Sequence, residues 1–338
     1  INDLKKDYYA IFENDQTSKP AHLNIKNSFF QNNHGVLFKR FDTKIYNSQF
    51  TNNSGKIIYE PYGLYIENST FEKNAGNVID SELGYNIQVI NSIFNDNAEI
   101  AIYAGIYENS LKILDTSFNR NINGCISVYG YFLDAYSNQE PQLYIENCNF
   151  NNNLSHAVRG AGIKMQIESS NFQDNEEAIE STYQQQGQDS NIYCYSYLIM
   201  NNCKISGSTG GYSVSFDGSG GIIKNSKIES STSTGIFVKG KPFSNTLQND
   251  IEIIFTNFDG NSSYNIYNSS IEDIKAINNY WGTTNEPLIY QKIYDYFDNS
   301  TYGKVIFYPF LSEPYVYIPS NDDFPWSLFL PAILGSKK

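Results

Sequence analysis

A short sequence pattern recurs along most of this chain of 338 residues. Its first clear copy runs from Leu23 to Asn33 and reads LNIKNSFFQNN, and similar copies follow at residues 45–53, 66–74 and 89–97. The later copies centre on Phe118, Phe150, Phe172, Ile205, Ile228 and Phe258. The period is about 22 residues, and three copies carry insertions of roughly ten residues. Such a period predicts stacked repeats, since one short unit cannot bury its own apolar face.

Each copy has the spacing of β-strands. Apolar residues alternate at Leu23 and Ile25 and again at Leu143 and Ile145, which is strand rather than helix periodicity. Asn or Asp, which tolerate a left-handed backbone, recur as corner residues at Asn27, Asn47, Asn68, Asn91, Asp115 and Asn147. Short strands with regular corners predict an all-β fold, a right-handed single-stranded parallel β-helix of about 11–12 coils with terminal caps.

Stacked coils align like residues into two ladders that run along the axis. We expect a core ladder made of Phe30, Phe50, Phe71, Phe94, Phe118, Phe150, Phe172 and Phe258. We expect an asparagine ladder, also at corners, made of Asn33, Asn53, Asn74, Asn97, Asn121, Asn153, Asn175 and Asn261. Each coil buries about four apolar side chains at roughly 1.5–3 kcal/mol each, so stability accumulates coil by coil.

The Phe-x-x-Asn of these ladders resembles the repeat of the polymorphic outer-membrane proteins and other right-handed parallel β-helix proteins. The resemblance covers residues 20–310 and departs from the pattern where Ser208 and Ser231 replace the asparagine. The segment from Ala276 to Thr283 is similar to a sequence that closes many β-helix chains. The resemblance implies a secreted or surface-displayed scaffold, often an adhesin, and implies no chemistry.

The two ends are expected to differ from the repeat. Residues 1–311 form the β-helix with an N-terminal cap and a closing segment after Trp281, in which residues 287–297 have the spacing of a short amphipathic helix and residues 305–311 form a strand. Residues 312–338 form a Pro-rich apolar tail, which either folds back on its own β-helix or docks into a neighbouring copy. Its expected assembly contacts are Phe324, Trp326, Leu328, Phe329 and Leu330.

Composition limits the partners. The formal net charge is -13 and only 17% of residues are charged, so the basic surface that nucleic acids require is missing. No apolar run reaches the roughly 18 residues of a membrane span. The start at Ile1, without Met, indicates a processed or truncated chain.

Reactive side chains give no catalytic or metal motif, and no cofactor is predicted. The four cysteines, Cys125, Cys148, Cys194 and Cys203, lack zinc-ligand spacing, and a 125–148 bond, a 194–203 bond and free buried thiols all stay open. The three histidines are expected to be solvated. Carboxylate pairs such as Asp174 with Glu176, or Asp96 with Glu99, are common in turns and are not predicted to be catalytic.

Two surface features are more informative. Asn52, Asn268 and Asn299 begin Asn-x-Ser/Thr sequons and are the ones expected to point outward as glycosylation candidates. Tyrosines outside the apolar positions either lie partly buried in strands or present binding surface to glycans or a neighbouring molecule. They are Tyr59, Tyr62, Tyr65, Tyr103, Tyr107, Tyr129, Tyr131, Tyr193, Tyr195 and Tyr197.

We therefore expect an extracellular or cell-surface structural or adhesive β-helix without catalytic activity, one that self-associates into filaments or arrays and has glycans as a further partner. The alternative is a carbohydrate-active β-helix that binds or cleaves polysaccharides, as a lyase or a glycoside hydrolase. A cleft lined by carboxylates from successive coils favours this alternative.

Overall fold

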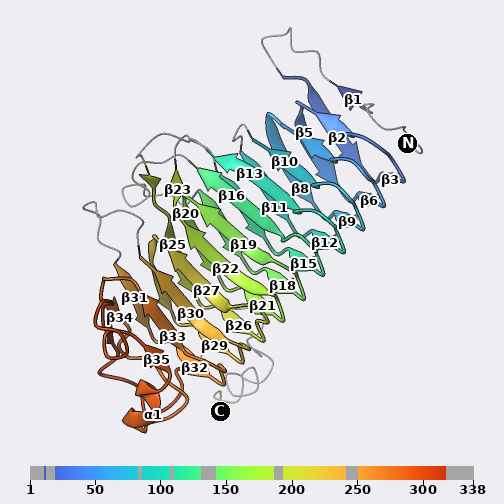
Figure 1. Cartoon of the computed structure of the whole chain (residues 1–338). Coiled ribbons are helices and arrows are strands. Elements are labelled where there is room, and N and C mark those ends of the chain that lie inside the picture. Colours follow the sequence, from blue (N-terminus) through green and yellow to red (C-terminus); the bar gives the residue numbers. More distant parts are fainter. Residues whose placement is uncertain are drawn as a thin grey trace, which may run out of the picture.

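The chain winds through three long parallel sheets, and each full coil contributes one strand to each sheet (Figure 1). The computed structural model describes residues 11–12, 20–82, 86–106, 110–130, 142–185, 193–240 and 250–316. All three sheets are parallel throughout these residues, and the coils stack in sequence order from the N-terminal to the C-terminal end. The fold is the predicted right-handed parallel β-helix.

Sheet I contains β1 (Ile11–Phe12), β4 (Phe38–Lys39), β7 (Ile58–Tyr59), β10 (Ile79–Ser81), β13 (Ile102–Ile106), β16 (Ile126–Gly130), β19 (His156–Ala161), β22 (Glu177–Thr182), β27 (Tyr212–Asp217), β30 (Thr234–Lys239), β33 (Ile266–Ser269) and β35 (Ile293–Tyr294). Sheet II contains β2 (His22–Lys26), β5 (Asp42–Tyr46), β8 (Gly63–Glu67), β11 (Ile87–Ile90), β14 (Leu111–Leu114), β17 (Leu143–Glu146), β20 (Lys164–Glu168), β25 (Tyr197–Asn201), β28 (Gly220–Lys224), β31 (Ile251–Ile254), β34 (Ile274–Lys275) and β36 (Val305–Ile306). Sheet III contains β3 (Phe29–Gln31), β6 (Gln49–Thr51), β9 (Thr70–Glu72), β12 (Ile93–Asn95), β15 (Ser117–Asn119), β18 (Asn149–Asn151), β21 (Asn171–Gln173), β26 (Lys204–Ser206), β29 (Lys227–Glu229) and β32 (Asn257–Asp259). A short antiparallel pair, β23 (Gln184–Gln185) with β24 (Tyr193–Cys194), lies between β22 and β25.

Stacked phenylalanines fill the core beneath sheet III. From Phe30 to Phe172, successive rings lie 4.6–4.9 Å apart and within 12° of parallel. This distance matches the spacing of neighbouring strands, because the same position of each coil lies above the last. Ile205 and Ile228 continue the register after Phe172, and Phe258 then stacks on Trp281.

The expected asparagine ladder is present and satisfies the buried amides. The backbone N and the Nδ2 of Asn53 both donate to Oδ1 of Asn74, at 3.1 and 3.0 Å, and Nδ2 also donates to the Phe30 carbonyl. The ladder asparagines, however, are not the left-handed corners. The positive φ falls one residue earlier, as at Asn52 (55°) and Lys73 (55°), because this turns the asparagine inward.

The first corner, between sheets II and III, follows the sequence closely. Asn27, Asn47 and Asn68 have φ values of 47–51°. A buried small residue comes next, as at Ser48, whose backbone N donates to the Ser69 hydroxyl. Cys148 and Cys203 occupy this same row, and each backbone N donates to a serine hydroxyl of the next coil.

The cysteines are buried free thiols in the structure. None of Cys125, Cys148, Cys194 and Cys203 is bonded to another. Burial raises the pKa of Cys148 and of Cys203 to about 12, so these thiols are held in their unreactive protonated form at neutral pH.

The closing segment is less regular than predicted. The helix α1 spans Glu286–Tyr290 alone, and the predicted helix to residue 297 is wrong, because Ile293 and Tyr294 instead join sheet I as β35. The predicted strand over residues 305–311 is reduced to β36. Within the described residues, no helix has the length and apolar character that crossing a bilayer requires.

The insertions all fall at one corner. Residues 83–85, 107–109, 131–141 and 241–249 lie outside the described residues, and each segment connects a strand of sheet I to the next strand of sheet II. Residues 186–192 also lie outside them and connect β23 to β24, within the link from β22 of sheet I to β25 of sheet II. In the chain, the additional residues of the longer repeats therefore all fall between a strand of sheet I and the following strand of sheet II.

Candidate functional site

The outer face of sheet I carries aromatic and charged side chains in strand register. Strand pairing aligns Tyr59, Asp80, Tyr103, Ser127 and Arg159 in one row across β7, β10, β13, β16 and β19. Glu180 of β22 continues this row. Neighbouring members of such a row stand about 4.8 Å apart, so residues distant in sequence form one surface.

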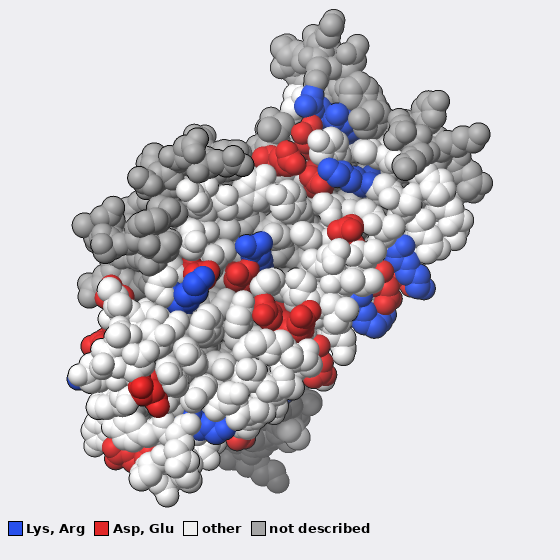
Figure 2. Space-filling view, in the orientation of Figure 1, with Lys and Arg blue, Asp and Glu red and all other residues white. Residues whose placement is uncertain are grey.

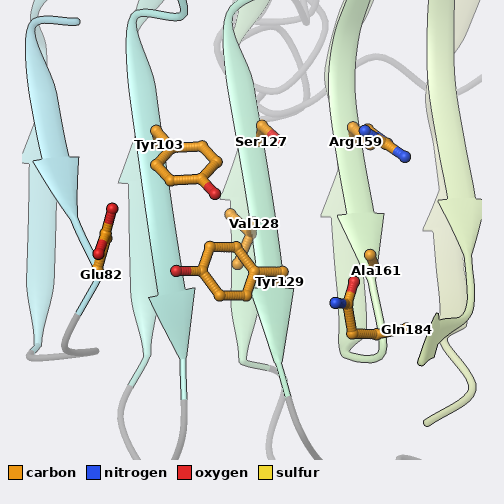
Figure 3. A pocket seen from close by; sticks show the side chains of 8 residues that line it. All are labelled: Glu82, Tyr103, Ser127, Val128, Tyr129, Arg159, Ala161 and Gln184. Atoms are coloured by element: carbon orange, nitrogen blue, oxygen red, sulfur yellow. The ribbon is translucent and has the colours of Figure 1, made fainter. Parts of the chain in front are cut away.

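A depression of about 330 Å³ opens on this face (Figure 3). Its lining consists of Glu82, Tyr103, Ser127, Val128, Tyr129, Arg159, Ala161 and Gln184. The rings of Tyr103 and Tyr129 lie 5.4 Å apart at 40° and form an aromatic wall. Gly105 leaves room for this wall, because a Cβ there would lie 2.9 Å from the Tyr129 ring. A smaller depression of about 70 Å³, lined in part by Ser155 and His156, lies on the other side of Arg159.

A charged cluster borders the depression. Arg159 Nε lies 2.6 Å from Glu180 Oε2, and His156 Nε2 lies 2.6 Å from Glu177 Oε2 and 3.3 Å from Glu180 Oε2. The expectation of a solvated His156 is therefore wrong. Burial disfavours the imidazolium, but the hydrogen bond to Glu177 and the attraction of both carboxylates outweigh it and raise the pKa of His156 above 6.5.

The raised pKa predicts a pH dependence. Protonated His156 stabilises the fold fully below about pH 6.5, and this contribution is lost as pH rises through the folded-state pKa. We expect an NMR titration of the His156 ring to give a midpoint above 6.5. The urea midpoint of the wild type is expected to fall as the pH rises above about 6.5, and this fall is expected to be smaller in H156Q, which lacks the titrating ring. A midpoint below 6.5 would contradict the described contacts.

Paired charges continue towards the N-terminal end. Lys56 Nζ lies 2.7 Å from Asp80 Oδ2 and 4.2 Å from the centre of the Tyr59 ring. Burial works against the charge of Lys56, but the hydrogen bond and attraction from Asp80 prevail and raise its pKa. Asp80 is only 3% exposed, so the carboxylate of this ion pair is buried within the outer face and does not project above it.

Aromatic rings continue towards the C-terminal end of the same face. Tyr212 and Phe237 stack at 5.8 Å, Phe237 and Tyr267 lie 5.5 Å apart, and Tyr267 and Tyr294 stack at 4.4 Å. Lys239 pairs with Asp217 at 3.0 Å beside them. The outer face of sheet I therefore combines aromatic rings with neutralised charge pairs over ten coils.

The other predicted residues have structural positions. The phenylalanine ladder is buried beneath sheet III, and the asparagine ladder is buried at the corner that follows each strand of sheet III, so neither is on this face. Asp96 receives two hydrogen bonds from Arg120, which lower the pKa of that carboxyl, and Glu99 accepts from Asn123. Glu176 accepts from the backbone N of Ser155. The expected tail contacts at Phe324, Trp326, Leu328, Phe329 and Leu330 lie outside the described residues.

The three glycosylation candidates differ in their exposure to solvent. Asn52 is exposed, and Asn299 is half-buried and accepts from the backbone N and hydroxyl of Thr301. Asn268 was expected to point outward, and this is wrong. It is buried, and its Nδ2 donates to the carbonyls of Glu272 and Gly303, because the closing segment covers it.

The tyrosines named in the sequence analysis also differ in their position in the fold. Tyr59, Tyr103 and Tyr129 lie on the outer face of sheet I, and Tyr65 and Tyr197 lie on that of sheet II. Tyr62 is half-buried. Tyr195 is buried, contrary to the expectation. Tyr107 and Tyr131 and the side chain of Tyr193 lie outside the described residues.

The charged cluster was missed because its members come from different coils. The register between Arg159 and Glu180 is fixed only once β19 and β22 are aligned. Among the described ranges, no group of three or more His, Cys, Asp or Glu side chains is arranged to hold a metal ion.

The sheets and ladders define the class as a right-handed parallel β-helix repeat protein. A scan against family models and a search of curated proteins give no match, so the resemblance to polymorphic outer-membrane proteins stays a prediction. Among solved structures, the chain is similar to the periplasmic alginate epimerase AlgG, at 9% identity and a TM-score of 0.49, over 86% of this chain and 73% of that one. It is also similar to HetL, a pentapeptide repeat protein involved in heterocyst differentiation regulation from the cyanobacterium Nostoc sp. strain PCC 7120, at 10% identity and a TM-score of 0.21, over 82% of this chain and 92% of that one.

The match to AlgG corrects the expectation that the chain is not an enzyme, because a protein with a similar fold is an epimerase. A likeness at this identity concerns the fold alone and assigns no reaction to this chain.

Proposed function

We propose that the protein is an extracellular or cell-surface adhesive β-helix that binds an extended glycan along the outer face of sheet I. The observation that carries the proposal is the depression in which Tyr103 and Tyr129 stand beside Arg159 and Gln184. Tyrosine rings offer apolar area with a polar edge, and planar guanidinium and amide groups bind hydroxyls with fixed geometry. A concave site with aromatic walls and a few polar groups is the usual form of a small-ligand site.

The length of the face favours a polymer over a single sugar. Aromatic side chains occur on it from Tyr59 in β7 to Tyr294 in β35, nine strand steps apart. At about 4.8 Å per step, the face extends over about 43 Å.

Its charge favours a neutral glycan. The cations Lys56, Arg159 and Lys239 are each paired with a carboxylate of the same face. Figure 2 shows acidic and basic side chains side by side in several small groups, separated by wide uncharged areas. With a net charge of -13, the chain repels anionic polymers.

Glycan binding is tested by affinity electrophoresis of the full chain in gels that contain neutral or anionic polysaccharides. We expect retardation by at least one neutral polysaccharide, and a loss of affinity of about tenfold or more in Y129A and in R159A. The matched control is Y144A, which removes a tyrosine of the same coil from sheet II. Unchanged retardation in Y129A and R159A would place binding elsewhere, and no retardation by any polysaccharide would refute the proposal.

A second candidate function is cleavage of the bound glycan. It is favoured by the two carboxylates of Glu177 and Glu180, which both approach Nε2 of His156 beside the depression. Retaining glycosidases use two carboxyl groups about 5–5.5 Å apart. Release of reducing ends by the wild type and its loss in E180Q would support this function, and equal release by E180Q would exclude these carboxylates.

A further inference from the structure

The segment that follows the closing strand β36 turns back onto the outer side of sheet III. The backbone N of Leu311 donates to the Asn279 carbonyl at 2.9 Å, one coil beyond β32. Four residues later, the side chain of Asn257 in β32 binds the backbone of Tyr315. Its Nδ2 donates to the Tyr315 carbonyl at 2.8 Å, and its Oδ1 accepts from the Tyr315 N at 2.7 Å. The described chain therefore runs back towards the N-terminal end along this side of the β-helix.

Two further observations show that the coil of β32 is adapted to this contact. Asn257 is 5% exposed, whereas the side chains at the same outward position in β29 and β26 are half-buried and exposed. Phe255 has a φ of 50°, in a corner position where the neighbouring coils have Asn225 and Asn278. A bulky residue is rare in this left-handed conformation. The Phe255 ring lies 5.5 Å from the Tyr315 ring, a contact that asparagine could not make.

The next outward side chains in this direction are basic. Strand register places Lys227 of β29 and then Lys204 of β26 in line with Asn257, and Figure 1 shows these three strands side by side. Both lysines lie near the same carboxylate, with Nζ of Lys227 at 2.6 Å and Nζ of Lys204 at 3.3 Å from Glu229 oxygens. The carboxylate of Asp259, aligned with Glu229 in β32, forms no ion pair with either lysine in the described part of the chain. Two ammonium groups that share one carboxylate can attract another.

The residues that follow in the sequence supply such carboxylates. Residues 317–323 read YIPSNDD and lie outside the described residues, and they include the adjacent Asp322 and Asp323. Pro319 favours an extended backbone. The farther lysine lies two coil steps from β32, which is about 10 Å, and the residues from Tyr315 to Asp322 span up to about 23 Å when extended. The chain is therefore long enough to bring a carboxylate to either lysine.

We propose that residues 312–323 form a strap across the last three strands of sheet III, in which Asp322 and Asp323 pair with Lys204 and Lys227 of the same chain. Because Asn257 already binds one end of this segment, the two carboxylates meet the lysines at a high effective concentration, which the carboxylates of a second copy have to exceed. The tail is then bound to its own β-helix and is not the contact through which copies assemble. The strap lies on sheet III, away from the proposed glycan site on sheet I.

Cross-linking of the full chain by a carbodiimide, which joins a carboxylate directly to an amine that contacts it, tests the proposal. The sample contains isotope-labelled and unlabelled chains in equal amounts, so that peptide masses distinguish bonds within one chain from bonds between two copies. We expect Lys204 or Lys227 to be joined to Asp322 or Asp323, with both peptides carrying the same isotope. A bond between Lys204 and Glu229, whose contact is described, is the internal positive control.

Limited digestion with chymotrypsin tests the two lysines. We expect the tail of K204Q/K227Q to be cleaved about tenfold faster than that of the wild type, because the protease cuts the released segment. The matched control K44Q/K112Q removes two exposed lysines of sheet II and should leave the rate unchanged. Matching circular dichroism spectra establish that the variants are folded.

Three results would overturn the proposal. The first is the control bond to Glu229 without any bond to Asp322 or Asp323, and the second is equal cleavage of K204Q/K227Q and the wild type. The third is a bond between peptides of different isotopes, which would show that the tail docks on a second copy. Neither experiment involves a glycan, so the results are independent of the proposed function.

Discussion

Replacing Phe118 with alanine is expected to lower the free energy of unfolding by about 3–5 kcal/mol. The Phe118 ring is fully buried and lies between the rings of Phe94 and Phe150, at 4.9 Å from each. Its removal leaves a void in the middle of a continuous stack, where neighbouring coils are held apart by their own strand hydrogen bonds and cannot close the gap. Both stacked contacts are lost together with the buried apolar area.

Urea unfolding followed by circular dichroism measures this effect. The control is F29A in the first coil, since the Phe29 ring is 51% exposed and its removal is expected to change stability by less than about 0.5 kcal/mol. A separate early transition in F118A would indicate that coils on the two sides of the gap unfold as independent units, as repeat proteins allow. Equal stability of F118A and the wild type would contradict the stacked core.

Much of the fold follows from local patterns that recur with the same meaning in every coil. The Phe-x-x-Asn pattern predicts both ladders, because parallel stacking converts a repeat in sequence into a column in space. The pattern holds even where Ile205 replaces phenylalanine and where Ser231 replaces asparagine. Ile205 keeps the register of Phe172, and the backbone N of Ser231 still donates to Oδ1 of Asn261.

The candidate site was less predictable, since it depends on residues at the positions that vary. Arg159 and Glu180 differ from the residues aligned with them in the neighbouring coils, so no repeat pattern draws attention to them. Tyr129 reaches its position only because Gly105 of the preceding coil lacks a side chain. Such contacts require the exact register between neighbouring coils, which period counting alone does not give. The prediction of a helix over residues 287–297 failed for a similar reason. Ile293 and Tyr294 pair with sheet I as β35, and the helical spacing of the segment does not reveal this pairing.

Asn121 is the ladder residue whose replacement tests the second column. Its Oδ1 accepts from the backbone N and the Nδ2 of Asn97, at 3.2 and 3.0 Å, and its Nδ2 donates to the Phe94 carbonyl and to Asn153 Oδ1, both at 3.0 Å. The residue is fully buried, so water cannot replace these partners. Each buried polar group left unpaired costs about 1–3 kcal/mol, and we expect N121A to lose about 3 kcal/mol of unfolding free energy.

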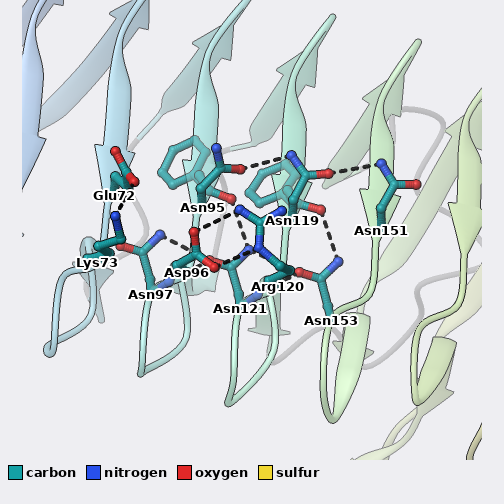
Figure 4. Close-up of polar contacts among 12 residues, drawn as sticks. Glu72, Lys73, Asn95, Asp96, Asn97, Asn119, Arg120, Asn121, Asn151 and Asn153 are labelled. Carbon is teal, nitrogen blue, oxygen red and sulfur yellow. Dashed lines mark hydrogen bonds and ion pairs between the residues drawn. The ribbon is translucent and has the colours of Figure 1, made fainter.

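The hydrogen-bonded amides of Asn95, Asn119 and Asn151 on the outer side of sheet III supply a matched comparison, since Asn119 lies two residues from Asn121 (Figure 4). N119A also removes one amide with two side-chain hydrogen bonds to neighbouring coils. Its partners Asn95 and Asn151 are half-exposed and can bind water, so we expect the free energy of unfolding to fall by less than about 0.5 kcal/mol. N121D separates hydrogen bonding from volume, because a carboxylate keeps the acceptors for Asn97 but loses both donors. It should destabilise at least as much as N121A at neutral pH and recover part of the loss on acidification, when the buried acid becomes neutral and regains a donor. If N121A and N119A prove equally mild, the inner amides contribute no more than the outer ones, and the stability of the β-helix rests on its apolar stack alone.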